Sequence, residues 1–302
     1  MHTPTAQSTP RASGPPAGAL ATLLAGAAAV GWAFLPTLAF LVDKWVDDPQ
    51  YSHGFLVPVF SGYLVWRAHK AGKLSAGRPW PAVGLGLLAG CVVFRWLAGG
   101  LMFHQLDCVA LLASVAAVVL AAGGRSLFVA TLPAVGFLAF MVPLPYEIER
   151  NVGGPLKVGA TQASTYLLQT LGLPAIAEGN LILIDDVRLG VVDACSGLKM
   201  LVTFSAFAAG AVLTLDRTRF EKLLIVLGIV PIAVLTNVLR ITATGVAYVW
   251  VKDEPTRHFL HDLHGWLMMP AGLGLLAAEL WALSRLVVPT APAPAVAGLR
   301  LA

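Results

Sequence analysis

Charged residues are scarce in this chain. They make up 12% of its 302 residues, whereas 57% of the residues are hydrophobic and the mean hydropathy is +0.77. Soluble domains carry about 25% charged residues. The net charge of +4 is small and dispersed, which argues against a nucleic-acid-binding surface. Because apolar runs recur along the whole length, the composition indicates a protein embedded in a lipid bilayer.

Cysteine is also scarce. Cys91 and Cys108 lie inside apolar runs, and Cys195 lies at the edge of another. There is no CxxC pair and no even-numbered set, so the pattern predicts free thiols rather than a disulfide framework or a cysteine metal site. We expect neither a cofactor nor a metal ion.

The apolar runs predict an all-α polytopic membrane protein. A hydrocarbon core of about 30 Å needs roughly 20 residues per helix. On that basis the sequence predicts about eight transmembrane helices, near residues 20–42, 54–67, 80–102, 106–122, 127–145, 196–215, 222–250 and 264–288. Arg95, inside the third run, should face protein or water, because an arginine that faces lipid costs at least a few kcal/mol.

One domain accounts for nearly the whole chain. Residues 19–288 are expected to form a single transmembrane domain. Residues 1–18, rich in Pro, Ser, Thr and Gly, predict a disordered tail, and residues 289–302 a flexible one.

Basic residues predict the orientation. Lys and Arg gather in the loops after the second, fourth and sixth runs and in the C-terminal tail, all on one side if there are eight spans. Such residues mark the cytoplasmic side, so both termini should lie there.

The one long segment on the outer side, residues 146–195, is too polar to span the bilayer. Its first part shows apolar residues at helical spacing, typical of an amphipathic helix in the membrane interface. The stretch "NLILIDDVRLGVVDA" predicts a short β-hairpin that reverses at Asp185 and Asp186, between the fifth and sixth spans. This hairpin would lead the chain directly to Cys195.

Cys195 stands in "VVDACSGLKMLV", with Ser196 and Gly197 before a long apolar run. If a helix begins there, the thiol faces unpaired backbone N–H groups, whose partial positive charge favours a thiolate. That setting suits a nucleophile. The alternative is a small hydrophobic residue at a helix start.

Arg240 interrupts the seventh apolar run. Counted from Lys222 at about 1.5 Å per residue, it lies roughly 27 Å across the membrane, close to the outer face and level with Cys195. Asn237, one turn earlier on the same face, could hold the guanidinium by a hydrogen bond. The alternative is an arginine that snorkels at a helix end.

Three histidines precede the eighth span. His258, His261 and His264 repeat every three residues, which could suggest a metal site, but this spacing runs around a helix and no acidic or cysteine cluster completes a coordination shell. A histidine near neutral pH also serves as a general acid or base. The spacing does not choose among the three, and His53 is a further candidate. Thiolate, imidazole and guanidinium at one rim would support acyl transfer.

Four motifs in sequence resemble the exosortase and archaeosortase family: "YSHGFLVP", "DACSGLK", "NVLR" and "HDLHGW". The resemblance runs from about Tyr51 to the end of the eighth span. It implies a cysteine transpeptidase or protease of the bacterial inner membrane whose active site faces the periplasm. Its partners would be secreted proteins with a C-terminal sorting signal, made of a Pro-Glu-Pro-type motif, a transmembrane helix and a basic tail.

Carried over by position, the resemblance assigns the catalytic roles to Cys195, Arg240 and His261. Cys195 would form a thioester and pass the product to an envelope acceptor. Ser196, Gly197 and Asn237 would support this site. Tyr51, Ser52 and His53 are candidates for binding the substrate.

Two other classes stay open. In a non-catalytic transporter or polysaccharide-export component, Arg240 and the histidines would bind an anionic ligand, and Cys195→Ser would be tolerated. In a metal-dependent membrane hydrolase, the histidine triplet would hold the ion. No nucleic-acid partner is expected in any of the three.

Overall fold

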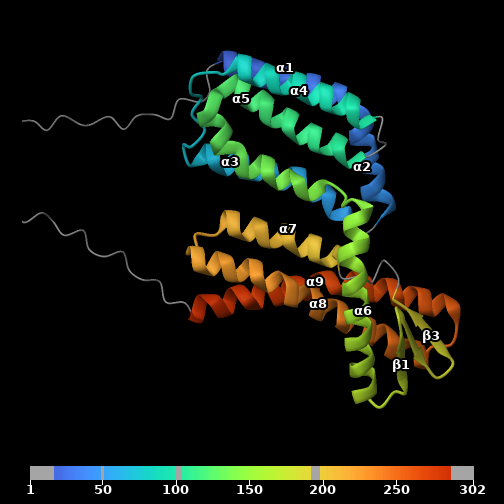
Figure 1. Cartoon of the computed structure of the whole chain (residues 1–302). Coiled ribbons are helices and arrows are strands. Elements are labelled where there is room, and N and C mark those ends of the chain that lie inside the picture. Colours follow the sequence, from blue (N-terminus) through green and yellow to red (C-terminus); the bar gives the residue numbers. More distant parts are fainter. Residues whose placement is uncertain (1–16, 49–50, 100–103, 192–197, 287–302) are drawn as a thin grey trace, which may run out of the picture.

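The computed structural model describes residues 17–48, 51–99, 104–191 and 198–286. These residues are mainly helical, with one small sheet (Figure 1). The helices are α1 (Ala17–Ala33), α2 (Leu35–Asp47), α3 (Leu56–Lys70), α4 (Pro81–Gly99), α5 (His104–Phe137), α6 (Tyr146–Thr170), α7 (Leu198–Thr214), α8 (Arg219–Trp250) and α9 (Glu254–Leu286). Two 3₁₀ helices, η1 (Ser52–Phe55) and η2 (Leu138–Met141), precede α3 and follow α5.

Two groups of helices lie on either side of a gap between ribbons in Figure 1: α1 to α5, and α7 to α9. Two apolar clusters hold these groups together, and the first of them also takes in Ala206 of α7, where the two groups meet. The first cluster joins α1, α2, α3 and α5 with that part of α7, and the other joins α7, α8 and α9. Helix α6 runs across one end of both groups, beside the sheet (Figure 1). We call this end the sheet end and the opposite one the far end.

Local sequence explains two sharp bends. Pro36 opens α2, and the axes of α1 and α2 differ by 70°. Within α5, Gly124 has φ 63° and ψ −163°, and the carbonyl of Arg78 occupies the place where a Cβ would stand. Only glycine fits there. Figure 1 shows the α5 ribbon folding back on itself, so this turn separates the segments predicted as the fourth and fifth spans.

Three described helices are long and apolar enough to cross a membrane: His104–Met141, Arg219–Trp250 and Leu263–Leu286. The bent pair of α1 and α2 makes a fourth if it forms one broken span, and Pro81–Leu97 and Met200–Thr214 are shorter apolar helices. The chain therefore has the helices of an integral membrane protein. The predicted number of eight spans stays a prediction, because several of the helices are short, bent or folded back.

The sheet has three antiparallel strands in the order β1 (Ala175–Glu178), β2 (Leu181–Ile184) and β3 (Val187–Gly190). The predicted hairpin is confirmed as β2 and β3, which turn at Asp185 with φ 50°. Strand β1 was not predicted. Its signal is the Gly179-Asn180 turn, in which Gly179 has φ 60°.

The sheet is anchored on α8. Ile182 and Ile184 pack with Leu168 of α6 and Ile241 of α8 in one buried cluster. At about 1.5 Å per residue, the 32 residues of α8 extend about 48 Å, well beyond a hydrocarbon core of about 30 Å. The excess length at the sheet end supports the sheet and α6. Helix α9 also starts earlier than its predicted span, at Glu254, where Asp253 accepts a hydrogen bond from the backbone N–H of Thr256 (3.0 Å).

Candidate active site at the sheet end

Arg240 is buried where α8 meets α9. Its side chain is 7% exposed, and a Cβ placed on Gly265 would lie 3.7 Å from its Nη2 atom. The guanidinium thus lies against a residue of α9 that has no side chain. His261 stands four residues earlier in α9, so its backbone lies one turn closer to the sheet end on the same face of the helix.

A second contact joins the same two helices. Nδ1 of His264 lies 3.2 Å from the hydroxyl oxygen of Thr244, and the tautomer of the imidazole decides which of them donates. Thr244 follows Arg240 by one turn on α8. The α8–α9 contact is therefore fixed at the level of the HDLHGW motif.

The start of α7 lies at that level too. Helices α7 and α9 run in the same direction because short turns join each of them to α8. The ring of Phe204 packs against the bare backbone of Gly272. Counted back from this contact at about 1.5 Å per residue, Leu198 lies about 9 Å and Gly265 about 10.5 Å toward the sheet end. Leu198, Gly265 and Arg240 thus share one level.

Cys195, Ser196 and Gly197 lie outside the described residues. The described chain ends at Val191, whose N–H donates to the carbonyl of Asn180 at the end of the sheet (2.8 Å), and resumes at Leu198. Leu198 is buried against Gly153 of α6. The residues that flank Cys195 in sequence are thus held by the sheet on one side and by α6 and α7 on the other.

Asn237 lies one turn before Arg240 and is 1% exposed. It lines a mainly apolar cavity of about 460 Å³ between α6 and α8, together with Asn151, Val152, Pro155, Leu156, Gly159, Ala160 and Val234. Asn237 and Arg240 both belong to α8, one turn apart, and the predicted hydrogen bond between them stays a prediction.

Tyr51 and His53 join the first group of helices to the site. The Tyr51 hydroxyl donates to Oε1 of Glu149 in α6 (2.6 Å) and accepts from the N–H of Leu144 (3.2 Å). Nδ1 of His53 lies 3.3 Å from the hydroxyl of Thr203, on α7 about 7.5 Å from Leu198. Tyr51 and His53 are buried and Ser52 is exposed, and a role of these three residues in binding substrate stays a prediction.

Burial raises the pKa of the Tyr51 phenol well above its usual value of 10.0, and the hydrogen bond to Glu149 raises it further. Tyr51 is therefore a neutral hydrogen-bond donor at physiological pH. Position 54 requires glycine because its backbone packs directly against the indole of Trp45, where a Cβ would clash. Trp45 Nε1 donates a hydrogen bond to the carbonyl of Met141 (3.1 Å).

No group of three or more His, Cys, Asp or Glu side chains that could hold a metal ion occurs within the described residues. The side chains of His258 and His261 are outside that description, although both residues belong to α9. The free thiols predicted for Cys91 and Cys108 are confirmed.

Sequence reasoning missed four residues that organise this end of the molecule: Glu149, Thr203, Thr244 and Gly265. Each makes its contact with a residue at least twenty positions away, so periodicity within one helix carries no sign of the pairing. Gly265 had a signal, because a glycine inside a helical apolar run marks close packing.

The fold and this buried set of polar residues define a helical membrane protein with a polar site at one rim. A sequence model of the transmembrane exosortase family (Exosortase_EpsH) matches residues 45–278, most of the chain. The chain therefore belongs to the transmembrane exosortase family, and membership in it indicates a membrane transpeptidase. Neither a curated protein nor a solved structure matched the chain.

Proposed function

We propose that this protein is a cysteine transpeptidase that cleaves the C-terminal sorting signal of secreted proteins at the periplasmic surface of the bacterial inner membrane. The observation that carries the proposal is the common level of Arg240, Gly265 and Leu198. Three helices thereby bring an arginine, a histidine-bearing turn and the segment after Cys195 to one level of the bundle.

The distances within the chain support this assignment. Cys195 precedes Leu198 by three residues, and an extended chain spans at most about 3.6 Å per residue, so its Cα is within about 11 Å of that of Leu198. His261 is one turn, about 6 Å, from Gly265. These lengths support a site in which Cys195 and His261 stand at one level of the helical bundle.

The proposed reaction is acyl transfer in two steps. The Cys195 thiolate adds to the scissile carbonyl, and Arg240 stabilises the negative charge that develops on its oxygen. The C–N bond then breaks as the leaving amine takes a proton from His261, which leaves a thioester on Cys195. An acceptor amine of the envelope, or water, then adds to the thioester carbonyl and gives a proton to His261, and the C–S bond breaks to release the Cys195 thiolate.

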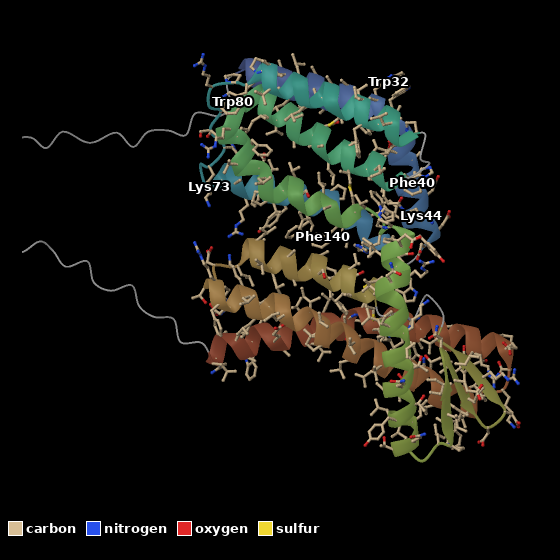
Figure 2. All side chains as sticks on the ribbon, in the orientation of Figure 1. Trp32, Phe40, Lys44, Lys73, Trp80 and Phe140 are labelled. Carbon is tan, nitrogen blue, oxygen red and sulfur yellow. The ribbon has the colours of Figure 1, made fainter. Side chains whose placement is uncertain are left out.

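The proposed orientation places the sheet end in the periplasm and both chain termini in the cytoplasm, with about eight spans. Figure 2 shows Lys73 and Trp80 at the far end and Lys44 at the sheet end. The basic loop between α3 and α4 and the turn between α7 and α8 both lie at the far end (Figure 1), in agreement with the positive-inside rule.

The test uses full-length protein in membranes and a secreted reporter that ends in a Pro-Glu-Pro motif, an apolar helix and an arginine-rich tail. Immunoblots follow loss of that tail. Cys195→Ala and Cys195→Ser should both abolish the size shift, and Cys91→Ser, at a thiol inside α4, should leave it unchanged. Hydroxylamine should release a trapped acyl-enzyme from the active protein only.

Processing that survives in both Cys195 variants would reject the cysteine mechanism. If Cys195→Ser is tolerated while Arg240→Ala is inactive, the result favours a transporter or export component that binds an anionic ligand. Loss of activity with a chelator would instead favour a metal-dependent hydrolase.

A further inference from the structure

A groove runs between α3 and α7, in the region where the two groups of helices meet. Its volume is about 380 Å³, and it is lined by His53, Leu56, Val57, Val59, Phe60, Tyr63, Phe137, Thr203, Ala206, Phe207, Gly210, Ala211 and Thr214. Resting on the proposed function, we infer that this groove holds the apolar transmembrane helix of the substrate while Cys195 attacks the bond just outside it.

The groove continues directly from the candidate site. Its wall on α7 starts at Thr203, five residues beyond Leu198, and Thr203 contacts His53. From Thr203 to Thr214 the wall extends about 16 Å, roughly half of a hydrocarbon core. A helix seated along it would have its sheet-end terminus beside the start of α7.

The two walls suit a helix. Ala206 and Gly210 are buried where α7 packs against α3, so these small residues form the floor of the groove, and the less buried Phe207, Ala211 and Thr214 line its side on α7. The opposite wall is aromatic, with Phe60 in contact with Phe137 at a ring separation of 4.7 Å. Val59 and Leu56 are 70% and 59% exposed, so one side of the groove is open to the bilayer.

Polarity along the groove also fits this occupant. The polar groups of its lining stand toward its two ends, His53 and Thr203 at one and Tyr63 and Thr214 at the other. Beyond Thr214, the carboxylate of Asp216 is fully exposed, apart from a 3.8 Å contact with Arg67. The distribution of polar groups therefore fits an apolar helix with a polar motif at its sheet-end terminus, and the far end carries both signs of charge, with Asp216 beside Arg67.

Crosslinking tests occupancy without requiring turnover. In the Cys195→Ala background, p-benzoylphenylalanine replaces Phe207 in the groove or, as the control, Val92, which is 68% exposed on α4. Illumination with the reporter should give an adduct at position 207 that maps to the reporter's apolar helix, and none at 92. An adduct with lipid or with a second copy of this chain, in place of the reporter, would overturn the inference.

Filling the groove tests its role in turnover. A Cβ on Gly210 would lie 3.1 Å from Phe60, so Gly210→Leu should reduce processing more than 10-fold, and Gly210→Leu with Phe60→Ala should recover most of it. Gly86→Leu in α4, where no atom lies within 4 Å, is the control and should change nothing.

The outcomes separate this inference from the proposed function. If processing depends on Cys195 but is unaffected by Gly210→Leu, and crosslinking gives no adduct at position 207, the assignment of the groove to the substrate helix is wrong and the proposed function stands. If the adduct forms but processing does not depend on Cys195, the groove binds the substrate helix as inferred and the cysteine mechanism is wrong.

Discussion

Arg95 and Arg240 both interrupt apolar helices, and they are held in different ways. The Arg95 guanidinium lies 3.6 Å from the Asp107 carboxylate and 4.4 Å from the ring centre of Phe34, and it donates to the carbonyl of Ala33. All of these partners belong to the first group of helices. Arg240 lies instead on the bare backbone of Gly265, at the level where α7 starts. The contacts of Arg95 thus stay within one group of helices, whereas Arg240 lies at the level where the proposed function puts the developing oxyanion.

The largest expected effect separates the two arginines. Arg240→Lys should lower the initial rate of reporter cleavage about 100-fold or more, because a lysine ammonium cannot reproduce the planar fork of donors and removing a donor to an oxyanion costs about 10²–10³ in rate. Arg95→Lys keeps a cation beside Asp107 and should stay within threefold of the original rate. Equal losses in both variants would erase the distinction.

Much of this comparison could be predicted from the sequence. The place of Arg240 in the second half of α8, one turn after Asn237, followed from helix rise alone. The charge of Arg95 predicted that it would face protein or water, and it contacts Asp107. The β2–β3 hairpin followed from alternation and a turn signal. These features are local in sequence, so they follow from the hydrophobic periodicity of one segment and from the free-energy cost of exposing a charge to lipid.

Contacts between distant segments could not be predicted in the same way. The packing of Gly272 on Phe204 sets the level of α7 relative to α9, and nothing in either helix alone encodes that register. The fold-back at Gly124 depends on the carbonyl of Arg78, which lies in another segment. The early start of α9 could not be predicted because its first residues are polar, and the span was placed by hydropathy alone. The capping hydrogen bond from the N–H of Thr256 to Asp253 begins the helix before the apolar run.

The next largest effect on the cleavage rate is expected for substitutions of Gly265. A Cβ there would lie 3.7 Å from Arg240, an ordinary contact, so Gly265→Ala should keep nearly full activity. Gly265→Leu should displace the guanidinium and lower the cleavage rate about 10- to 100-fold, since misplacing a catalytic group by about 1 Å costs about 100-fold. Gly274→Leu, on the same helix with no atom within 4 Å, is the matched control. Equal rates for Gly265→Leu and Gly274→Leu would contradict the contact's importance.

The Arg95–Asp107 pair should affect stability rather than chemistry. Asp107→Leu leaves a cation in an apolar setting and should lower the free energy of unfolding in detergent by about 2–3 kcal/mol, reduced from the buried-pair range because both side chains are 27% exposed. The double variant Arg95→Leu with Asp107→Leu should recover most of that loss. Cleavage per folded molecule should stay constant throughout. A rate loss that exceeds the loss of folded protein would show that Arg95 also serves the reaction.

Tyr51→Phe carries the smallest expected effect, because it loosens the joint between the two groups of helices without touching the reacting atoms. Loss of the hydrogen bonds to Glu149 and Leu144 should cost about 1–2 kcal/mol of stability and lower cleavage two- to fivefold. The raised pKa of Tyr51 means that its contribution is complete below the unfolded-state pKa of about 10 and is lost as pH rises toward the higher folded-state value. The stability difference between the original protein and Tyr51→Phe should therefore be constant up to about pH 9 and shrink above pH 10, as measured by thermal unfolding at each pH. A difference that grows with alkalinity would mean that the phenolate, not the phenol, is the form that α6 binds.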